Sequence, residues 1–261
     1  MNLHWEEMTS AELGAAARDL GGVCVLPLGC VEKHAAHLPL GTDVFVARKA
    51  ADLAVAREPA VIFPPLFLGW IHDGKHHPGA VALPPDTLLA MLEGICAEIA
   101  RNGFRKIILL NGHGGNSPFL SYFVWKGMAE KRPYQIYCLR LEDWYERPED
   151  EGILEEGIGH AGEGETSCLL ASRPDLARMD RASSSGPARG RLSQLPPSST
   201  GWEWYADWPE HHQGDGSKGS VEKGELLMAN MAGRVARAIA AVRSDLAVEA
   251  LQEEFFGRIR H

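Results

Sequence analysis

The chain has 261 residues, of which 45% are hydrophobic and 23% charged, and its 26 basic and 35 acidic side chains give a formal net charge of −9. This length and apolar fraction are typical of a globular protein with a well-buried core, and they exclude a disordered chain. An acidic balance without a cluster of Lys and Arg argues against a protein that binds nucleic acid through its phosphates.

The sequence also argues against a membrane protein. It has no run of about 18 apolar residues, and residues 1–7 lack the basic and apolar parts of a signal peptide. We therefore expect a cytoplasmic protein. The cysteines are odd in number and lack C-x-x-C spacing, which predicts buried free thiols rather than disulfides or metal ligands. They are Cys24, Cys30, Cys96, Cys138 and Cys168.

In chain order, residues 21–29 are a short apolar run between glycines, which predicts a strand buried on both faces. Residues 60–67 also favour an extended chain, but their prolines limit part of it to an edge or a loop. A helix is then predicted between Asp86, a candidate N-cap, and the stop signal Asn102-Gly103. Its apolar residues recur at helical spacing and are Leu88, Leu92, Ile95 and Ile99.

The next segments alternate between the two kinds of element. Residues 105–111 predict a strand that leads into a glycine-rich turn at 112–115. Residues 116–131 predict a helix, and residues 134–140 predict another strand. This alternation predicts an α/β domain with a largely parallel sheet and helices on both faces. Active sites in such domains lie at the carboxyl ends of the strands.

The rest of the chain predicts no second domain. Residues 183–199 and 202–219 are rich in Ser, Pro, Gly and Trp, and we expect surface excursions within a single domain of residues 1–261. The last element is predicted to be a helix with one apolar stripe that packs on the core. The stripe consists of Leu227, Met231, Val235 and Ile239.

The common catalytic signatures G-x-S-x-G, G-x-x-x-x-G-K-[ST] and H-E-x-x-H are absent. Histidines and carboxylates instead gather at three places, each of which follows a predicted strand or opens a predicted helix. They are Glu32, His34, His37 and Asp43 after the first strand, His113 after the strand at 105–111, and His160, Glu163 and Glu165 in a loop that enters a helix.

Each cluster alone also fits solvated histidines or an ordinary turn. An α/β sheet, however, would bring all three to one edge. Glu32 and His34 share a face if the chain is extended there, and Asp43 can return to them after the bend at residues 39–41. Such ligands suit Zn²⁺ or Mn²⁺, and a carboxylate can bridge two ions. The pattern favours a metal-dependent hydrolase, with a metal-free binding module as the alternative.

Residues 28–43, with the sequence LGCVEKHAAHLPLGTD, resemble the signature glycine-x-x-Glu-Gln-His-Gly-Pro-His-Leu-Pro-Leu-x-Thr-Asp of the creatininase (creatinine amidohydrolase) family. Residues 78–80, 111–116 and 160–167 resemble the later motifs of that family in the same order. The resemblance implies a three-layer α/β/α sandwich with a mostly parallel sheet. It also implies two zinc or manganese ions at the sheet edge and a cytosolic homo-oligomer, often a hexamer.

The resemblance also implies the metal ligands. Glu32, Asp43 and His113 would hold one ion, while His34 and the bridging Asp43 would hold the other. The second ion then needs one more ligand.

Creatininases place a Glu two residues after the histidine of their Asn-Gly-His motif, where this chain has Gly115. Glu165 is the expected replacement, with Glu163 as the alternate. In the reaction that follows, a water shared by two metal ions would ionise near neutral pH and attack an amide or formamide carbonyl. His160 would donate a proton to the leaving nitrogen, with its tautomer held by a neighbouring carboxylate. His160 and Glu163 are therefore the expected catalytic residues.

The remaining histidines have two readings each. His37 either donates to a metal ligand or packs beside Pro39. His72, His76 and His77 either line the mouth of the pocket or lie in a solvated loop.

The substrate stays open at this stage. Creatininases cover the flat creatinine ring with an aromatic residue just before the catalytic histidine, where this chain has Glu-Glu-Gly at 155–157. Small-molecule substrates with a cyclic amide, a formamide or a small peptide bond all fit. The rival function is a non-catalytic, metal-stabilised oligomer in which Gly115 marks the loss of the second metal ion. A tryptophan could cover a ligand instead, the candidates being Trp144, Trp202, Trp204 and Trp208.

Overall fold

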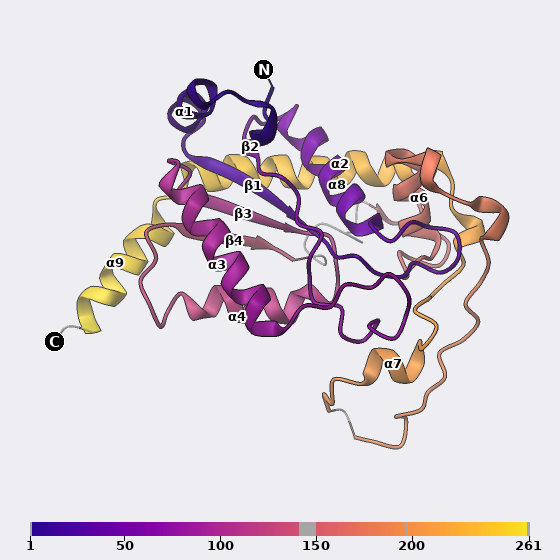
Figure 1. Cartoon of the computed structure of the whole chain (residues 1–261). Coiled ribbons are helices and arrows are strands. Elements are labelled where there is room, and N and C mark those ends of the chain that lie inside the picture. Colours follow the sequence, from indigo (N-terminus) through magenta and orange to yellow (C-terminus); the bar gives the residue numbers. More distant parts are fainter. Residues whose placement is uncertain (1, 141–149, 197, 260–261) are drawn as a thin grey trace.

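The computed structural model describes residues 2–140, 150–196 and 198–259. Within these residues a parallel sheet of four strands lies at the centre, in the order β2-β1-β3-β4 (Figure 1). Leu28 pairs with Asn111, so the carboxyl ends of β1 and β3 lie side by side. The strands are β1 (Val23–Leu28), β2 (Val61–Ile62), β3 (Lys106–Asn111) and β4 (Gln135–Leu139).

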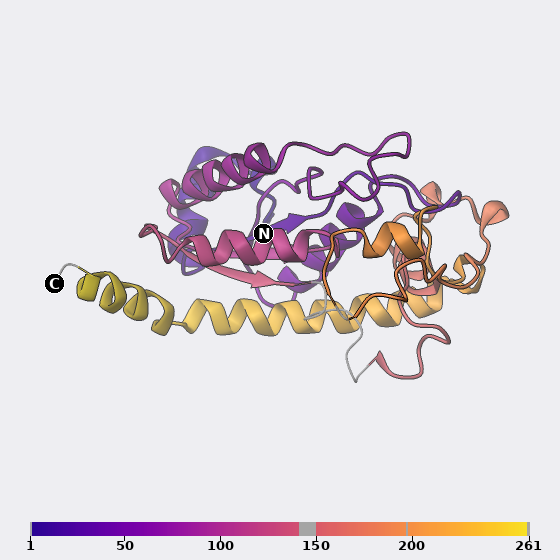
Figure 2. The ribbon, with the colours of Figure 1, turned by 90° about the horizontal axis from the view of Figure 1, so that it is seen from below.

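Helices cover both faces of the sheet. On one face, Val25 and Ile108 pack against α2 (Thr42–Val55) and α8 (Val221–Ser244). On the other, Leu26 and Leu109 pack against α1 (Ser10–Asp19), α3 (Pro85–Arg101) and α4 (Asn116–Lys126). The side chains of successive strand residues thus point alternately into the cores on the two faces of the sheet. Both faces of the central strands are buried, which explains why these strands are apolar throughout. Figure 2 shows α8 along one side of the sheet and α3 along the other. The predicted three-layer α/β/α fold is confirmed.

The other helices lie around these layers. α6 (Glu163–Ser172) packs on α8, α7 (Glu203–Asp207) lies in a long excursion, and α9 (Ala247–Ile259) follows α8. Short 3₁₀ turns among the described residues are η1 (Trp5–Glu7), η3 (Pro174–Leu176), η4 (Met179–Arg181) and η5 (Gly216–Lys218). In the part of the chain that the structure describes, no helix is both long and apolar enough to span a membrane.

Most predicted elements are confirmed, with corrections at their ends. The predicted helix at 86–102 is α3, but Asp86 lies inside its first turn and Pro84 occupies the N-cap position. Pro85 explains the shift, because its fixed φ favours the first helical residue. The predicted helix at 116–131 ends at Lys126, where Gly127 and the turns after it replace the last helical residues.

Two predictions about the C-terminal half are corrected. The predicted stripe on α8 is fully buried, but α8 is not the last element, since α9 follows it. Residues 183–196 and 198–199 are mostly exposed, as expected of a surface excursion. Residues 202–219, in contrast, contain α7 and the buried His211, so this second excursion returns to the core of the molecule.

Candidate metal centre

The structure brings the five expected metal ligands to one edge of the sheet. Glu32 and His34 lie in the loop after β1, and Asp43 lies in the first turn of α2. His113 follows β3, and Glu165 lies in the first turn of α6. All five side chains are buried. Buried charges of this density require compensation by a proton or a metal ion.

The first group of side chains consists of Glu32, Asp43 and His113. His113 Nδ1 lies 2.9 Å from Glu32 Oε1 and 3.1 Å from Asp43 Oδ2. On the far side of the ring, Nε2 donates to the carbonyl oxygen of Trp70 at 2.8 Å. Because a carbonyl can only accept, the neutral ring carries its proton on Nε2 and presents a lone pair at Nδ1 to the two carboxylates.

The second group consists of His34, Asp43 and Glu165. His34 Nε2 lies 2.9 Å from Asp43 Oδ1 and 3.5 Å from Glu165 Oε2. His34 Nδ1 lies 3.4 Å from the carbonyl oxygen of Glu32, which can only accept a hydrogen bond. The neutral ring of His34 therefore also presents a lone pair to the carboxylates. Asp43 belongs to both groups through different oxygens, which is the arrangement of a bridging carboxylate.

These residues fit a pair of cations. Glu32 Oε1 is buried and accepts no hydrogen bond, despite its short distance to His113 Nδ1. An unpaired carboxylate oxygen beside the lone pair of a histidine nitrogen is the arrangement expected where both atoms bind the same metal ion. The electrostatics agree. Although burial favours the neutral ring, the charges of Asp43 and Glu165 raise the pKa of His34 to about 10. The carboxylates around His34 thus favour a positive charge at this position.

Gly115 occupies the position where the family resemblance implies a glutamate. A Cβ atom on residue 115 would lie 2.5 Å from His113 Nε2 and 2.7 Å from the carbonyl oxygen of Trp70. Any side chain there would therefore break the hydrogen bond that orients the His113 ring. Glu165 reaches the same centre from α6, and its Oε2 also accepts the backbone N–H of Ala161 at 2.7 Å.

His160 lies directly beside this centre. Its ring centroid is 4.4 Å from that of His34, and its Nδ1 is 3.8 Å from Glu165 Oε2. Its Nε2 donates to the carbonyl oxygen of Lys33 at 2.9 Å, which leaves a lone pair on Nδ1. Burial and the neighbouring histidines lower the pKa of His160 to about 3. The ring is therefore neutral and can accept a proton at Nδ1.

Glu163 lies apart from the centre, two residues before Glu165. One of its oxygens accepts the backbone N–H groups of Glu155 and Glu156 at 2.8 and 3.0 Å, and the other pairs with Lys223 on α8. These contacts hold the pKa of Glu163 below its usual value, despite its burial. In the structure Glu163 thus links α6 to α8 and to residues 155–156, and it does not lie beside His160 and the expected metal ligands.

Sequence reasoning missed His211. Its Nε2 lies 2.6 Å from Glu32 Oε2, and its Nδ1 accepts the indole N–H of Trp204 at 3.0 Å. The proton of His211 is thereby fixed on Nε2, which donates to Glu32 and orients that carboxylate. The only signal in the sequence is the pair of histidines within a tryptophan-rich excursion, and 179 residues separate His211 from Glu32.

A cavity of about 350 Å³ opens onto the centre. Glu32, His113, His160 and Glu165 line it together with Asp73 and Trp204. A second cavity of about 640 Å³ shares Asp73 and is lined by His72, His76, Trp202 and Tyr205.

Three further histidines, His37, His76 and His77, hold the surrounding loops. His76 and His77 both donate to the carbonyl oxygen of Pro209, so the 72–77 loop is fastened to the excursion that carries Trp204. In the described structure, His37 has no hydrogen bond to any of the five expected ligands. Its Nε2 lies 2.9 Å from the Thr166 hydroxyl and links its loop to α6. Trp144 lies outside the described residues.

Comparisons with known proteins identify the family of the chain. The family model described as creatininase (creatinine amidohydrolase) matches residues 6–239. The creatinine amidohydrolase of Pseudomonas putida is 30% identical over 235 residues, covering 81% of this chain and 87% of that protein. A mycofactocin precursor peptide peptidase of Mycolicibacterium smegmatis is 28% identical over 220 residues, covering 79% of this chain and 80% of that protein. A solved creatininase in a Mn form is 27% identical, with a TM-score of 0.80 over 94% of this chain and 100% of that one.

Proposed function

The chain belongs to the creatininase family, and on this premise we propose that it is a metal-dependent hydrolase of a C–N bond in a small amide. The observation that carries the proposal is the convergence of two ligand groups on Asp43, one through each oxygen. A protein without bound cations would have little reason to bury three carboxylates around two imidazoles whose lone pairs face them.

In this proposal Glu32, Asp43 and His113 hold one ion, while His34, Asp43 and Glu165 hold the other. The ions are zinc or manganese, which accept such nitrogen and oxygen donors. When bound, a pair of these ions lowers the pKa of water toward neutrality and polarises a carbonyl group.

His160 moves the proton in the proposed reaction. Its Nδ1 faces the centre as a neutral acceptor, while Lys33 holds the opposite side of the ring. The ring can take a proton from the attacking water at Nδ1 and pass it to the leaving nitrogen, which would otherwise depart as an unstable amide anion. His211 keeps Glu32 ionised and oriented during this transfer, because its N–H donates to Glu32 Oε2.

The cavity supports a small substrate with a hydrogen-bond donor. Asp73 lies where the two cavities meet, and its buried Oδ1 has no hydrogen-bond partner in the described structure. An N–H group of a substrate would satisfy it. Trp204 packs edge-on against His160, with ring centroids 5.5 Å apart, and provides an apolar wall. Cyclic amides, formamides and short peptides therefore all remain in the proposed substrate class, and relatives named for creatinine and for a precursor peptide support this breadth.

The test is a hydrolysis screen with metal-replete protein. Creatinine, formamidopyrimidines and short peptides are incubated with the enzyme, and Asp43→Ala serves as the metal-deficient control. We expect about two equivalents of metal per chain and at least one substrate whose hydrolysis requires Asp43. Full metal content with no hydrolysis across the screen would favour a non-catalytic, metal-stabilised oligomer. Absence of bound metal would exclude both functions.

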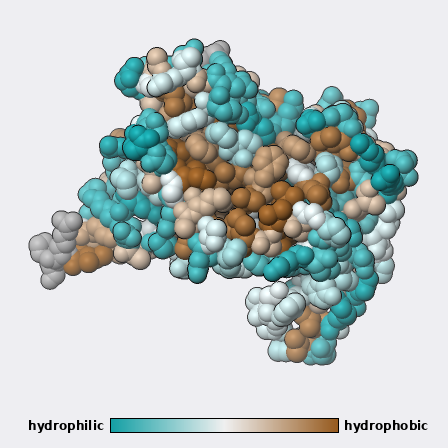
Figure 3. Space-filling view, in the orientation of Figure 1, coloured by the Kyte–Doolittle hydropathy of each residue, from teal (hydrophilic) through white to brown (hydrophobic). Residues whose placement is uncertain are grey.

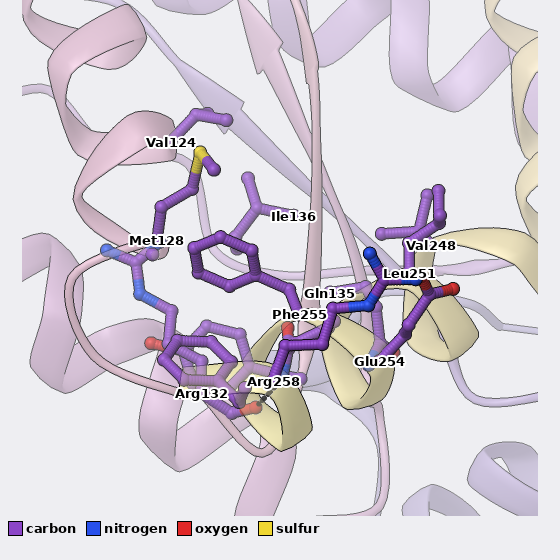
Figure 4. A pocket seen from close by; sticks show the side chains of 14 residues that line it. Val124, Met128, Arg132, Gln135, Ile136, Val248, Leu251, Glu254, Phe255 and Arg258 are labelled. Atoms are coloured by element: carbon purple, nitrogen blue, oxygen red, sulfur yellow. Dashed lines mark hydrogen bonds and ion pairs between the residues drawn. The ribbon is translucent and has the colours of Figure 1, made fainter. Parts of the chain in front are cut away.

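We also propose that the protein is a cytoplasmic homo-oligomer, with the hexamer that the family resemblance implies as the expected assembly. Figure 3 shows apolar residues gathered at the centre of one face, and Trp125 on α4 is 77% exposed. A cavity of about 440 Å³ between α4, β4 and α9 exposes Met128, Leu251 and Phe255 (Figure 4). Further copies of this chain would cover such surfaces. The free thiols support a reducing compartment. Light scattering of the purified protein measures the assembly.

A further inference from the structure

Cys30 differs from the other cysteines in its surroundings. It lies between β1 and Glu32 and is fully buried. Its Sγ is 3.4 Å from Asp43 Oδ2. The sulfur, one oxygen each of Glu32 and Asp43, and one nitrogen of His113 all lie within 4.8 Å of one another. Among the residues that the structure describes, no other cysteine belongs to such a group.

We propose that Cys30 is a metal ligand and completes the first group as a sulfur, nitrogen and two-oxygen donor set. The inference rests on the proposed function, because it adds a donor to the same centre. It also makes the two metal sites unequal. The second group offers only nitrogen and oxygen, from His34, Asp43 and Glu165.

The distances permit one ion to contact all four donors. In a tetrahedral zinc site, with Zn–S at about 2.3 Å and Zn–O at about 2.0 Å, sulfur and oxygen lie about 3.5 Å apart. Cys30 Sγ and Asp43 Oδ2 are separated by 3.4 Å. Glu32 Oε1 supplies independent evidence that the donors point to a common position, because it is buried there without a hydrogen bond.

Metal binding would exchange one contact for another. The thiol now donates to Asp43 Oδ2. On coordination the thiol proton would pass to solvent, the resulting thiolate would form the sulfur–metal bond, and Asp43 Oδ2 would become free to bind the ion. Thiolate is a soft ligand that favours zinc over manganese, whereas carboxylate and imidazole accept both. Cys30 therefore gives the first site a preference for zinc that the second site lacks.

Cobalt provides the readout, because a cobalt–thiolate bond produces a charge-transfer absorption band in the near ultraviolet that oxygen and nitrogen ligands do not. Metal-free full-length protein is titrated with Co²⁺, and bound cobalt is measured in parallel. The variants are Cys30→Ser, which keeps a hydrogen-bond donor toward Asp43, and Cys30→Ala. Cys24→Ala is the matched control, since Cys24 is equally buried in β1 and belongs to no ligand group.

We expect the band in the parent protein and in Cys24→Ala, and its loss in both Cys30 variants. The Kd for zinc should rise at least ~10-fold in Cys30→Ser, while the Kd for manganese changes less. Parent protein that binds cobalt without the band, or Cys30→Ala that keeps it, would overturn the role of Cys30 and leave the proposed function standing. Parent protein that binds no cobalt, zinc or manganese would overturn both.

Discussion

Two glutamates on one turn of α6 are expected to respond in opposite ways to the same substitution. Glu163 pairs with Lys223 and accepts two backbone N–H groups, whereas Glu165 faces His34 and Asp43, the other two members of the second proposed ligand group. Glu163→Gln should reduce stability and leave the metal content intact. Glu165→Gln should reduce the metal content and leave the stability of the metal-free protein nearly unchanged. The pair thereby separates anchoring from metal binding.

The magnitude for Glu163→Gln follows from its contacts. A glutamine keeps one oxygen for the backbone N–H groups of Glu155 and Glu156 but turns an NH₂ group toward the Lys223 ammonium. The lost charge-assisted hydrogen bond is worth about 1.5–3 kcal/mol. For a chain of this size that loss lowers Tm by roughly 3–12 °C. Glu165 differs because burial and the charge of Asp43 raise its pKa to about 7, so a neutral side chain costs the metal-free fold little.

Thermal unfolding of the metal-free proteins and metal analysis of the loaded proteins test both variants. Lys223→Gln, alone and combined with Glu163→Gln, completes a double-mutant cycle that isolates the pair. A coupling energy near zero would show that the contact does not anchor α6. Loss of metal in Glu163→Gln at unchanged stability would refute the assignment and restore Glu163 as a ligand or catalytic residue.

Three further substitutions test other parts of the centre. Asp43→Ala should empty both metal sites, since each group uses one of its oxygens; metal analysis that finds full occupancy would disprove the bridge. His160→Ala should retain the metal ions and slow turnover by roughly 10²- to 10⁴-fold, as measured by steady-state kinetics; an unchanged rate would remove His160 from the proton transfer. Ala35→Gly should stabilise the protein by about 1 kcal/mol in thermal unfolding, because Ala35 has a φ of 51°; a loss of stability would show that its backbone is not strained.

The sequence predicts the layers of this fold well because the layers depend on local patterns. Leu227, Met231, Val235 and Ile239 recur at helical spacing, and the structure buries all four on α8. The positions of Glu32 and His113 beside one another follow from parallel pairing of the strands that precede them. These features require only that the apolar face of each helix packs on the sheet and that the strands pair in parallel.

Other features depend on contacts that no local pattern encodes. His211 reaches Glu32 from a distant excursion, and its own φ of 55° places it in a conformation that few non-glycine residues adopt. The role of Gly115 likewise follows from Trp70, which lies 43 residues from the histidine that it orients. Glu165 is predicted as a ligand only through the resemblance. The resemblance also predicts a catalytic role for the neighbouring Glu163, whose ion pair with Lys223 turns it away from the ligand groups.

The position of Glu165 depends on how closely α6 approaches α8. Gly224 on α8 faces the carbonyl oxygen of Ser167, and a Cβ atom there would collide with it. Gly224→Ala must therefore push α6 outward and withdraw Glu165 from the second ligand group, while Glu32 and His113 stay on loops that follow the sheet. We expect metal content to fall from about two equivalents per chain to about one.

Gly94→Ala on α3 is the control, because the added Cβ would have no described atom within 4 Å apart from its chain neighbours and the nearby backbone of its own helix. This variant should keep both ions and gain roughly 0.5–1 kcal/mol from helix propensity. If Gly224→Ala retained two ions, the position of the Glu165 carboxylate would not depend on the packing of α6 against α8. The hydrogen bond from the Ala161 N–H would then be sufficient to hold it. The close packing of α6 against Gly224 of α8 is thus expected to decide whether Glu165 reaches the second ligand group.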